Sequence, residues 1–264
     1  MRTLRRSRVR VFSSLIRGCL DRLGYVLWKR EFLRYGISPF DDILRLSRGS
    51  GRSVRTFFDV GANIGQTARE ALGRFPAADI FAFEPHPDTF RRLTEVLRDK
   101  RLHAYQVALG DRDGEVTLYE YGSSGPDTLI NSLVPDARFA KQYGYSAKER
   151  LTVCSTVDSF CEKYGIENID ILKIDTEGFD LFVMKGAARM LMESRVGFIL
   201  TEYNDLQVQP GATGGALIPI AEYLALFGYR YVTSYTDCVI HKQEMFVCAN
   251  ALFSLPGYLR GAIA

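Results

Sequence analysis

The side chains of this sequence best suited to chemistry are carboxylates that stand where apolar runs end. They are Asp59, Glu84, Asp175 together with Glu177, and Glu202. A carboxylate can accept hydrogen bonds from hydroxyl or amino groups, take up a proton as a general base, or bind a divalent cation. In open α/β sheets, ligands bind outside the carboxyl ends of the strands. We therefore expect these acids to meet at one edge of a sheet.

A glycine-rich turn, Gly61-Ala62-Asn63-Ile64-Gly65, follows the first apolar run, 56–60. Glycine adopts positive φ and lets a ligand approach the backbone closely, and Asn63 tolerates the same left-handed conformation. The helix that we expect to begin near Gln66 presents free N–H groups to ligand oxygens or to a carboxylate. Glu84 lies about 20 residues beyond the turn, where a doubly wound fold places the acid that binds ribose hydroxyls.

The spacing of the turn favours S-adenosylmethionine over NAD. A dinucleotide fingerprint is G-x-G-x-x-G, whereas this turn is G-x-x-x-G and is preceded by Asp59. A carboxylate there would pair with the ammonium of a methionine moiety and would repel a pyrophosphate. The predicted cofactor-binding residues are Asp59, Gly61, Asn63, Gly65, Gln66 and Glu84, with Val107 and Ala108 beside the adenine. A turn that binds no ligand is the alternative interpretation.

The elements that must position these residues alternate between strands and helices, which predicts a mostly parallel sheet. Predicted strands are 56–60, a run ending at 83, 102–109, 151–156, 170–175, 197–201, 229–234 and 245–249, with 114–121 in a hairpin with 102–109. Predicted helices are 41–46, 88–100, 156–164, 180–193 and 217–227. The expected fold is α/β, a doubly wound, mostly parallel, seven-stranded Rossmann-like sheet whose last two strands are antiparallel. The irregular stretch 122–150 is predicted to be an insert that caps the acceptor side.

The N-terminal segment is strongly basic. Residues 1–34 hold ten Lys or Arg against two acids, a net charge of +8, so the remainder carries 3 − 8 = −5. Apolar residues recur at helical spacing over 12–27, which predicts an amphipathic basic helix. It would either pack on the domain or lie on an anionic membrane surface. Nucleic-acid binding is disfavoured because no stacking platform or binding motif accompanies the charge. We therefore divide the chain into a helical extension, 1–53, and a domain, 54–264.

Composition and cysteine usage indicate an ordinary globular protein. Of its 264 residues, 47% are hydrophobic and 25% are charged, which suits one large core. The five cysteines are scattered and lack the C-x-x-C spacing of metal sites, so we expect reduced thiols. No apolar run reaches the roughly 18 residues of a membrane span. The expected location is cytoplasmic, with a possible peripheral membrane contact through 1–34.

Three motifs together resemble the FkbM family of S-adenosylmethionine-dependent methyltransferases. They are D-V-G-A-N-I-G-Q at 59–66, F-E-P-H-P at 83–87 and I-D-I-L-K-I-D-T-E-G-F-D at 169–180, followed by Glu202. The resemblance implies a class I methyltransferase fold and transfer of a methyl group to oxygen. The implied acceptor is a hydroxyl of a sugar, glycan, polyketide or other secondary metabolite, and its identity is left open.

The reaction itself suggests roles for the acids. Methyl transfer from a sulfonium is an in-line displacement that depends on positioning, and an alcohol acceptor must also lose its proton. Asp175 is our first candidate for general base or acceptor orienter, before Glu177 and Glu202. Lys173, on the same strand face, would keep Asp175 ionised or form a structural salt bridge.

Two other kinds of chemistry stay open. Asp175, Glu202 and Asn204 could bind a divalent ion that acidifies the acceptor, in the manner of metal-dependent catechol-type methyltransferases. The protein could also be an NAD-type oxidoreductase, or a non-catalytic partner protein that binds the cofactor. The three histidines do not cluster, and His86, which flanks Glu84, is expected to be structural like the others.

Overall fold

The structure is a computed structural model of the chain, and it describes residues 19–24, 34–121, 130–133, 148–204, 215–241 and 244–259. The chain divides into two units, Met1–Ile37 and Ser38–Ala264. In the first unit, 19–22 are helical, and most of the predicted basic helix lies outside the described residues. So does most of the predicted insert 122–150. Among the described residues, no helix combines the length and the apolar character that crossing a bilayer requires.

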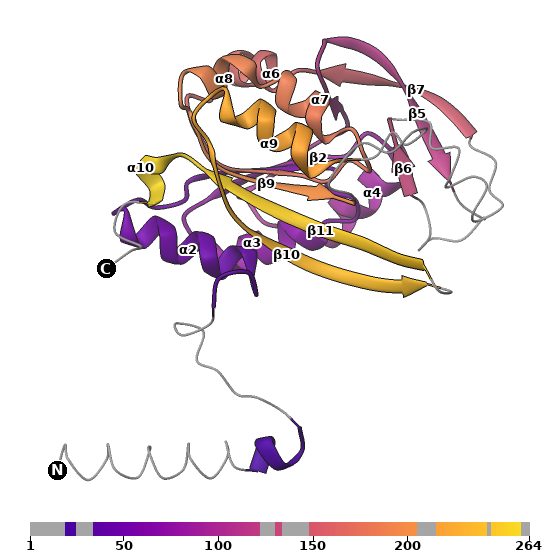
Figure 1. The fold of residues 1–264 in the computed structure, drawn as a ribbon. Coiled ribbons are helices and arrows are strands. Elements are labelled where there is room, and N and C mark those ends of the chain that lie inside the picture. Colours follow the sequence, from indigo (N-terminus) through magenta and orange to yellow (C-terminus); the bar gives the residue numbers. More distant parts are fainter. Residues whose placement is uncertain are drawn as a thin grey trace. The chain divides into compact units, whose positions relative to one another are not determined.

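A seven-stranded sheet forms the centre of the second unit, with the order β10-β11-β9-β8-β1-β2-β3 (Figure 1). The parallel strands are β1 (Thr56–Val60), β2 (Asp79–Phe83), β3 (Leu102–Tyr105), β8 (Ile169–Ile174) and β9 (Val196–Tyr203). The antiparallel strands are β10 (Arg230–His241) and β11 (Glu244–Ser254), and β11 is antiparallel to β9 as well. The sheet confirms the predicted α/β fold of the class I methyltransferase type, including its antiparallel end.

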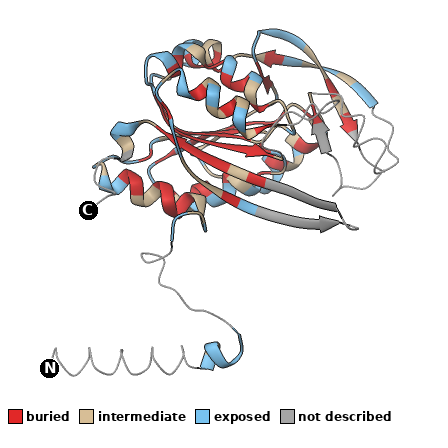
Figure 2. Cartoon of the chain, in the orientation of Figure 1, coloured by how far each residue is buried: buried red, intermediate tan, exposed pale blue. Residues whose placement is uncertain are grey.

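Helices cover both faces of this sheet, which explains why its central strands are almost continuously apolar. Figure 1 shows α2 (Pro39–Gly49), α3 (Gln66–Arg74) and α4 (Pro87–Val96) on one side, and α6 (Val157–Tyr164), α7 (Asp180–Lys185), α8 (Ala188–Met192) and α9 (Leu217–Ala225) on the other. A short helix, α10 (Pro256–Leu259), ends the described chain. Figure 2 shows the strands between the helices as buried. Two neighbouring residues of β1 serve the two faces, because Phe57 packs on Phe40 of α2 and Phe58 packs on Phe160 of α6.

Helix α2 belongs to the core of this unit, although it precedes residue 54, where we predicted the domain to begin. Its apolar stripe buries Phe40, Ile43 and Leu46 completely or nearly so. Each such side chain stabilises the fold by about 1.5–3 kcal/mol relative to an exposed one. Ser38 caps the helix, since its hydroxyl accepts the Asp41 N–H at 3.4 Å.

A second sheet corrects the predicted pairing of 102–109 with 114–121. Its strands are β4 (Ala108–Leu109), β5 (Gly114–Tyr121), β6 (Ile130–Ser132) and β7 (Lys148–Ser155), in the order β4-β7-β5-β6. The stretch 102–109 is therefore two strands, β3 in the main sheet and β4 in the second. Strand β5 pairs with β7 instead of forming a hairpin with 102–109. The Gly110 N–H donates to the Ser155 carbonyl at 2.9 Å and continues the β4–β7 pairing.

The predicted helix 180–193 was also wrong in its continuity, because it is interrupted between α7 and α8. A Cβ added at Gly186 would stand 1.9 Å from the Gly110 carbonyl oxygen, so the helical chain touches the end of β4 there. After the break, the Asp158 carboxylate accepts the N–H groups of Arg189 and Met190 at 2.8 and 3.0 Å. These bonds provide partners that the start of α8 would otherwise lack.

Candidate functional site

The glycine-rich turn joins the ends of three strands. Gly61, Asn63 and Gly65 have φ values of 79°, 49° and 89°, as the sequence predicted for a left-handed turn. A Cβ at Gly61 would lie 1.8 Å from the carbonyl oxygen of Asp175, and one at Gly65 would lie 2.6 Å from Leu93. The N–H of Gly61 donates to the Phe83 carbonyl at 3.0 Å. The glycines therefore let the turn pack directly on the ends of β2 and β8.

Glu84 stands one residue past the end of β2 and is held by backbone donors. Its carboxylate accepts the Asn63 N–H at 3.0 Å and the His86 N–H at 2.9 Å. Burial raises the pKa of Glu84 to about 7, although these two hydrogen bonds act in the opposite direction. The acid is thus fixed beside the turn, with lone pairs still free to accept hydrogen bonds from a ligand.

A cavity of about 300 Å³ opens between the turn and the second sheet. Six predicted cofactor residues line it: Gly61, Asn63, Gln66, Glu84, Val107 and Ala108. Apolar residues that were not predicted also line it, among them Leu109, Leu118 and Leu133 on the side of the second sheet. The strands that carry Leu109 and Leu118 were predicted, whereas Leu133 falls in the irregular stretch 122–150. The position of all three at the cavity follows only from the second sheet. Predicted residues Gly65 and Asp59 are not in the lining.

Asp59 lies under the site and pairs with Lys173 instead of facing the cavity. Its side chain is fully buried, and Lys173 Nζ is 3.4 Å from Asp59 Oδ1 and 3.1 Å from Asp175 Oδ2. Burial raises the pKa of Asp59, and Lys173 counteracts the rise. Burial alone would lower the pKa of Lys173, but the Asp175 and Asp59 carboxylates raise it above its ordinary value. Lys173 is therefore charged and bridges the two acids.

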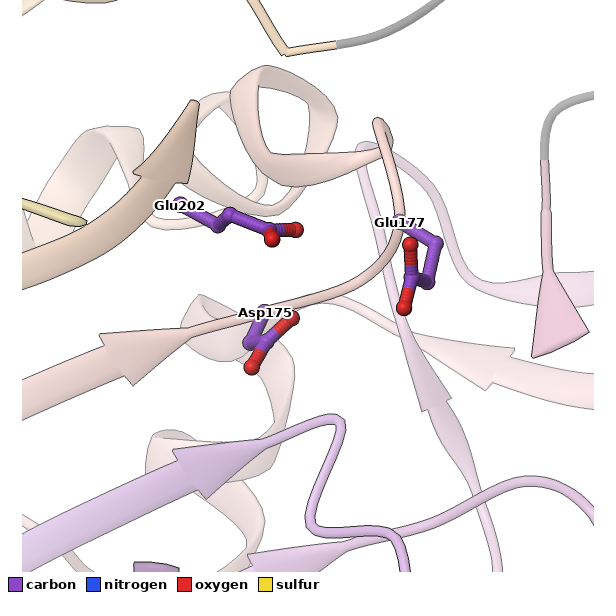
Figure 3. Close-up of side chains that lie close together, drawn as sticks. All are labelled: Asp175, Glu177 and Glu202. Atoms are coloured by element: carbon purple, nitrogen blue, oxygen red, sulfur yellow. The ribbon is translucent and has the colours of Figure 1, made fainter. Parts of the chain in front are cut away.

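Three carboxylates gather where β8 and β9 end, and we call Asp175, Glu177 and Glu202 the acid cluster (Figure 3). One oxygen of each lies within 4.8 Å of the others. Asp175 and Glu177 line the cavity, and Glu202 is buried beside them. Burial and the Asp175 and Asp180 charges raise the pKa of Glu177, an effect that solvent weakens because the residue as a whole is exposed.

The acid cluster supports two kinds of chemistry. Its oxygens could orient an acceptor hydroxyl and take up its proton, or they could hold a divalent cation, which prefers oxygen ligands. Two of the three residues that we predicted as cation ligands, Asp175 and Glu202, lie in the cluster together with Glu177, and the place of Asn204 as a ligand stays a prediction. Asp175 directly follows β8 and Glu202 lies near the end of β9, whereas Glu177 is carried by the loop after β8.

The loop that carries Glu177 is fixed by a buried carboxylate. Asp180 accepts hydrogen bonds from the Thr176 hydroxyl at 2.8 Å and from the Thr201 hydroxyl at 2.9 Å. Glu177 itself has a φ of 52°, a left-handed conformation that such support maintains. Thr176, Asp180 and Thr201 were not among the predicted site residues.

Comparison with known proteins agrees with the fold and the motifs. Residues 59–231 match the family model described as the methyltransferase FkbM domain. A 2-O-methyltransferase of Sinorhizobium fredii, NoeI, is 29% identical over 58% of this chain and 65% of its own length. The hexuronic acid methyltransferase AglP of Haloferax volcanii is 31% identical over 61% of each chain. The match thus spans somewhat less than two thirds of either relative.

Among solved structures, the N-methyltransferase NodS of Bradyrhizobium japonicum has a TM-score of 0.40 and 12% identity, covering 83% of this chain and 89% of that one. A likeness that distant adds nothing to the fold assignment, which rests on the strand order. The family match, by contrast, includes the end of β1, the turn, Glu84, the acid cluster and Lys173. This chain belongs to the FkbM methyltransferase family.

Proposed function

We propose that this protein is an S-adenosylmethionine-dependent O-methyltransferase that acts on a hydroxyl of a sugar, glycan or secondary metabolite. The observation that carries the proposal is one cavity that joins the glycine turn and Glu84 to Asp175 and Glu177. A nucleoside-binding half and a proton-accepting half are thus neighbours. The names of the two relatives, a 2-O-methyltransferase and a hexuronic acid methyltransferase, support a sugar-like acceptor.

The cavity residues fit the proposed cofactor. Glu84 has acceptor capacity left for ribose hydroxyls, and Val107 and Ala108 offer an apolar surface for an adenine. The cavity lining contains one lysine and no arginine among the described residues, and that lysine, Lys173, is already paired with two acids. A pyrophosphate would find no free cation there, which disfavours NAD. When bound, S-adenosylmethionine supplies an electrophilic methyl group.

On the acceptor side, the protein supplies orientation and a base. Asp175 Oδ2 is held 3.1 Å from Lys173 Nζ, at the edge of the cavity. We assign it to accept the proton of the acceptor hydroxyl, while Glu177 and Glu202 orient the hydroxyl. Lys173 acts through Asp175 and does not need to touch the acceptor. A divalent cation on the acid cluster is the competing mechanism, in which the same oxygens would serve as ligands.

Calorimetry with S-adenosylmethionine and with NAD, each titrated into wild type and Glu84→Ala, tests the cofactor. We expect micromolar binding of the first alone, and a strong loss of it in the variant. Methyl transfer from labelled S-adenosylmethionine to a panel of neutral and uronic sugars then tests Asp175→Asn, which should lose at least about a hundredfold in rate. Preference for NAD, or an Asp175→Asn enzyme with full activity, would refute the corresponding assignment.

For the segment 1–34, which has a charge of +8, we propose peripheral contact with an anionic membrane surface as the alternative to packing on the domain. Pelleting with anionic and with neutral vesicles, with and without residues 1–34, would test it. Binding to anionic vesicles that does not depend on these residues would remove the proposal.

A further inference from the structure

The second sheet provides one wall of the cavity, and it is attached next to the residues that line the opposite wall. Leu118 of β5 lines the cavity. Glu120, two residues further on, lies on the same face of β5, is buried, and places Oε1 3.3 Å from His86 Nε2. His86 follows Glu84 and Pro85, which line the cavity from the side of the main sheet. The contact between His86 and Glu120 therefore joins the two walls.

The protonation of His86 can be deduced from its neighbours. Its Nδ1 receives the backbone N–H of Thr89, 3.4 Å away, and a backbone N–H can only donate. The hydrogen of the neutral ring must then be on Nε2, from which it points to Glu120. Burial lowers the pKa of His86, which favours this neutral form. Its own backbone N–H donates to Glu84 at 2.9 Å, so one residue contacts both Glu84 and Glu120.

A second attachment lies at the acid cluster. The hydroxyl of Ser132, the last residue of β6, donates to the Glu177 carbonyl at 2.7 Å. The next residue, Leu133, lines the cavity. The second sheet is thus joined to the main sheet beside Glu84 and again beside Glu177.

We propose that His86 and Glu120 are positioning residues that hold β5 against the turn after β2, so that Leu118 closes the cavity beside Glu84. They set the affinity for the cofactor without contacting it. This inference rests on the proposed function for the identity of the cofactor, but the attachment of β5 does not depend on it. Glu120 also pairs with Arg150 of β7, which leaves its charge compensated when His86 is changed. Loss of the contact between His86 and Glu120 therefore weakens the attachment of β5, while Arg150 still compensates the buried charge of Glu120.

The decisive variant is His86→Asn, because asparagine keeps an oxygen that can cap α4 but is too short to reach Glu120. Glu120→Gln is the conservative partner, since its amide oxygen still accepts from Nε2. Glu115→Gln is the matched control, because Glu115 is exposed on the same strand. Hydrogen exchange of the full chain without ligand reports the attachment of β5, and calorimetry with S-adenosylmethionine reports affinity.

In His86→Asn we expect faster exchange across 114–121 and a Kd for S-adenosylmethionine raised about tenfold, which corresponds to one lost hydrogen bond. Glu120→Gln and Glu115→Gln should resemble wild type in both measurements. Unchanged exchange of β5 in His86→Asn would overturn the proposal, as would faster exchange with unchanged Kd. If wild type itself fails to bind S-adenosylmethionine, the proposed function and the affinity role both fail, and the exchange measurement still decides the attachment.

Discussion

Replacing Lys173 with methionine tests whether this residue supports the site from below. Its Nζ is 3.4 Å from Asp59 Oδ1, and both side chains are buried. At an effective dielectric constant of about 20, two unit charges at that distance of 3.4 Å attract each other by about 5 kcal/mol. Removing one partner of a buried pair costs about 3–5 kcal/mol, because the other charge stays without compensation. We therefore expect the free energy of unfolding of Lys173→Met to be about 3–5 kcal/mol lower than that of wild type at pH 8.

The loss should depend on pH in a definite direction. Asp59 already has a pKa raised above its ordinary 3.8, and without Lys173 the pKa rises further. An acid whose pKa is higher in the folded protein binds its proton more tightly there. Protonated Asp59 therefore contributes its full stabilisation at a pH below its pKa in the unfolded chain. This contribution is lost as the pH rises through the pKa of Asp59 in the folded protein. The deficit of Lys173→Met should therefore be smaller at pH 5 than at pH 8.

Urea unfolding followed by circular dichroism at both pH values measures this deficit. Lys100→Met, at an exposed position, is the control for loss of a lysine. The double variant Asp59→Asn/Lys173→Met removes the stranded charge and should recover more than half of the loss. A deficit below about 1 kcal/mol at pH 8, the size of an exposed ion pair, would refute the reasoning. Failure of the double variant to recover stability would do the same.

Three further predictions concern the turn, Glu84 and the acid cluster. Gly61→Ala should destabilise the protein by more than about 3 kcal/mol in thermal unfolding, because the new Cβ would stand 1.8 Å from the Asp175 carbonyl oxygen at a φ of 79°. Gly73→Ala is the control and should be neutral or stabilising, since nothing lies within 4 Å of a Cβ at that helical position. Because the pKa of Glu84 is raised to about 7, its carboxylate takes up a proton below pH 7, and the affinity for S-adenosylmethionine measured by calorimetry should fall there. The contribution of Glu84 to stability should rise over the same range, since the folded protein binds this proton more tightly than the unfolded chain. Glu84→Gln should remove the pH dependence of the affinity. Methyl transfer should be unchanged by EDTA if Asp175 is the base; a loss that Mg²⁺ restores would instead show a cation on the acid cluster.

The sequence was most informative where its signals are local. The strand Thr56–Val60, the positive φ values of Gly61 and Asn63, and Glu84 after the second strand were all predictable, because apolar runs, glycines and a following acid fall within one βαβ unit. The alternation of strands and helices was enough to predict the parallel sheet, because two strands joined by a helical crossover usually lie side by side in one sheet.

Predictions that required a partner distant in sequence failed. The alternation in 114–121 indicates a strand but cannot say that its neighbour is Lys148–Ser155, beyond an intervening stretch with few regular signals. Gly186 has the sequence context of an ordinary helical glycine, and only the proximity of Gly110 shows why the helix breaks there. The contact of His86 with Glu120 is hidden for the same reason, because it joins two sheets.

The positions of Asp59 and Asp175 along their strands explain why Asp59 is buried and Asp175 lines the cavity. Lys173 is opposite Asp59 in the β1–β8 register, and Ile174 is opposite Val60. Asp59 thus lies one residue inside the end of its strand, where a side chain meets its neighbour across the sheet and is buried. Asp175 stands one step beyond that end. Glu202 lies at the same level as Asp175, because Thr201 is opposite Ile174 in the β8–β9 register.

Glu84 obeys the same rule, since it follows Phe83, the last residue of β2. Inside the paired stretch of β1, Asp59 has a buried partner in Lys173, whereas Glu84 and Asp175 stand just beyond the ends of β2 and β8 and line the cavity. The distinction depends on a shift of one residue in strand length, and hydrophobicity does not define strand ends that closely. This is why the sequence could identify the acids as a group and still assign Asp59 to the cofactor instead of to Lys173.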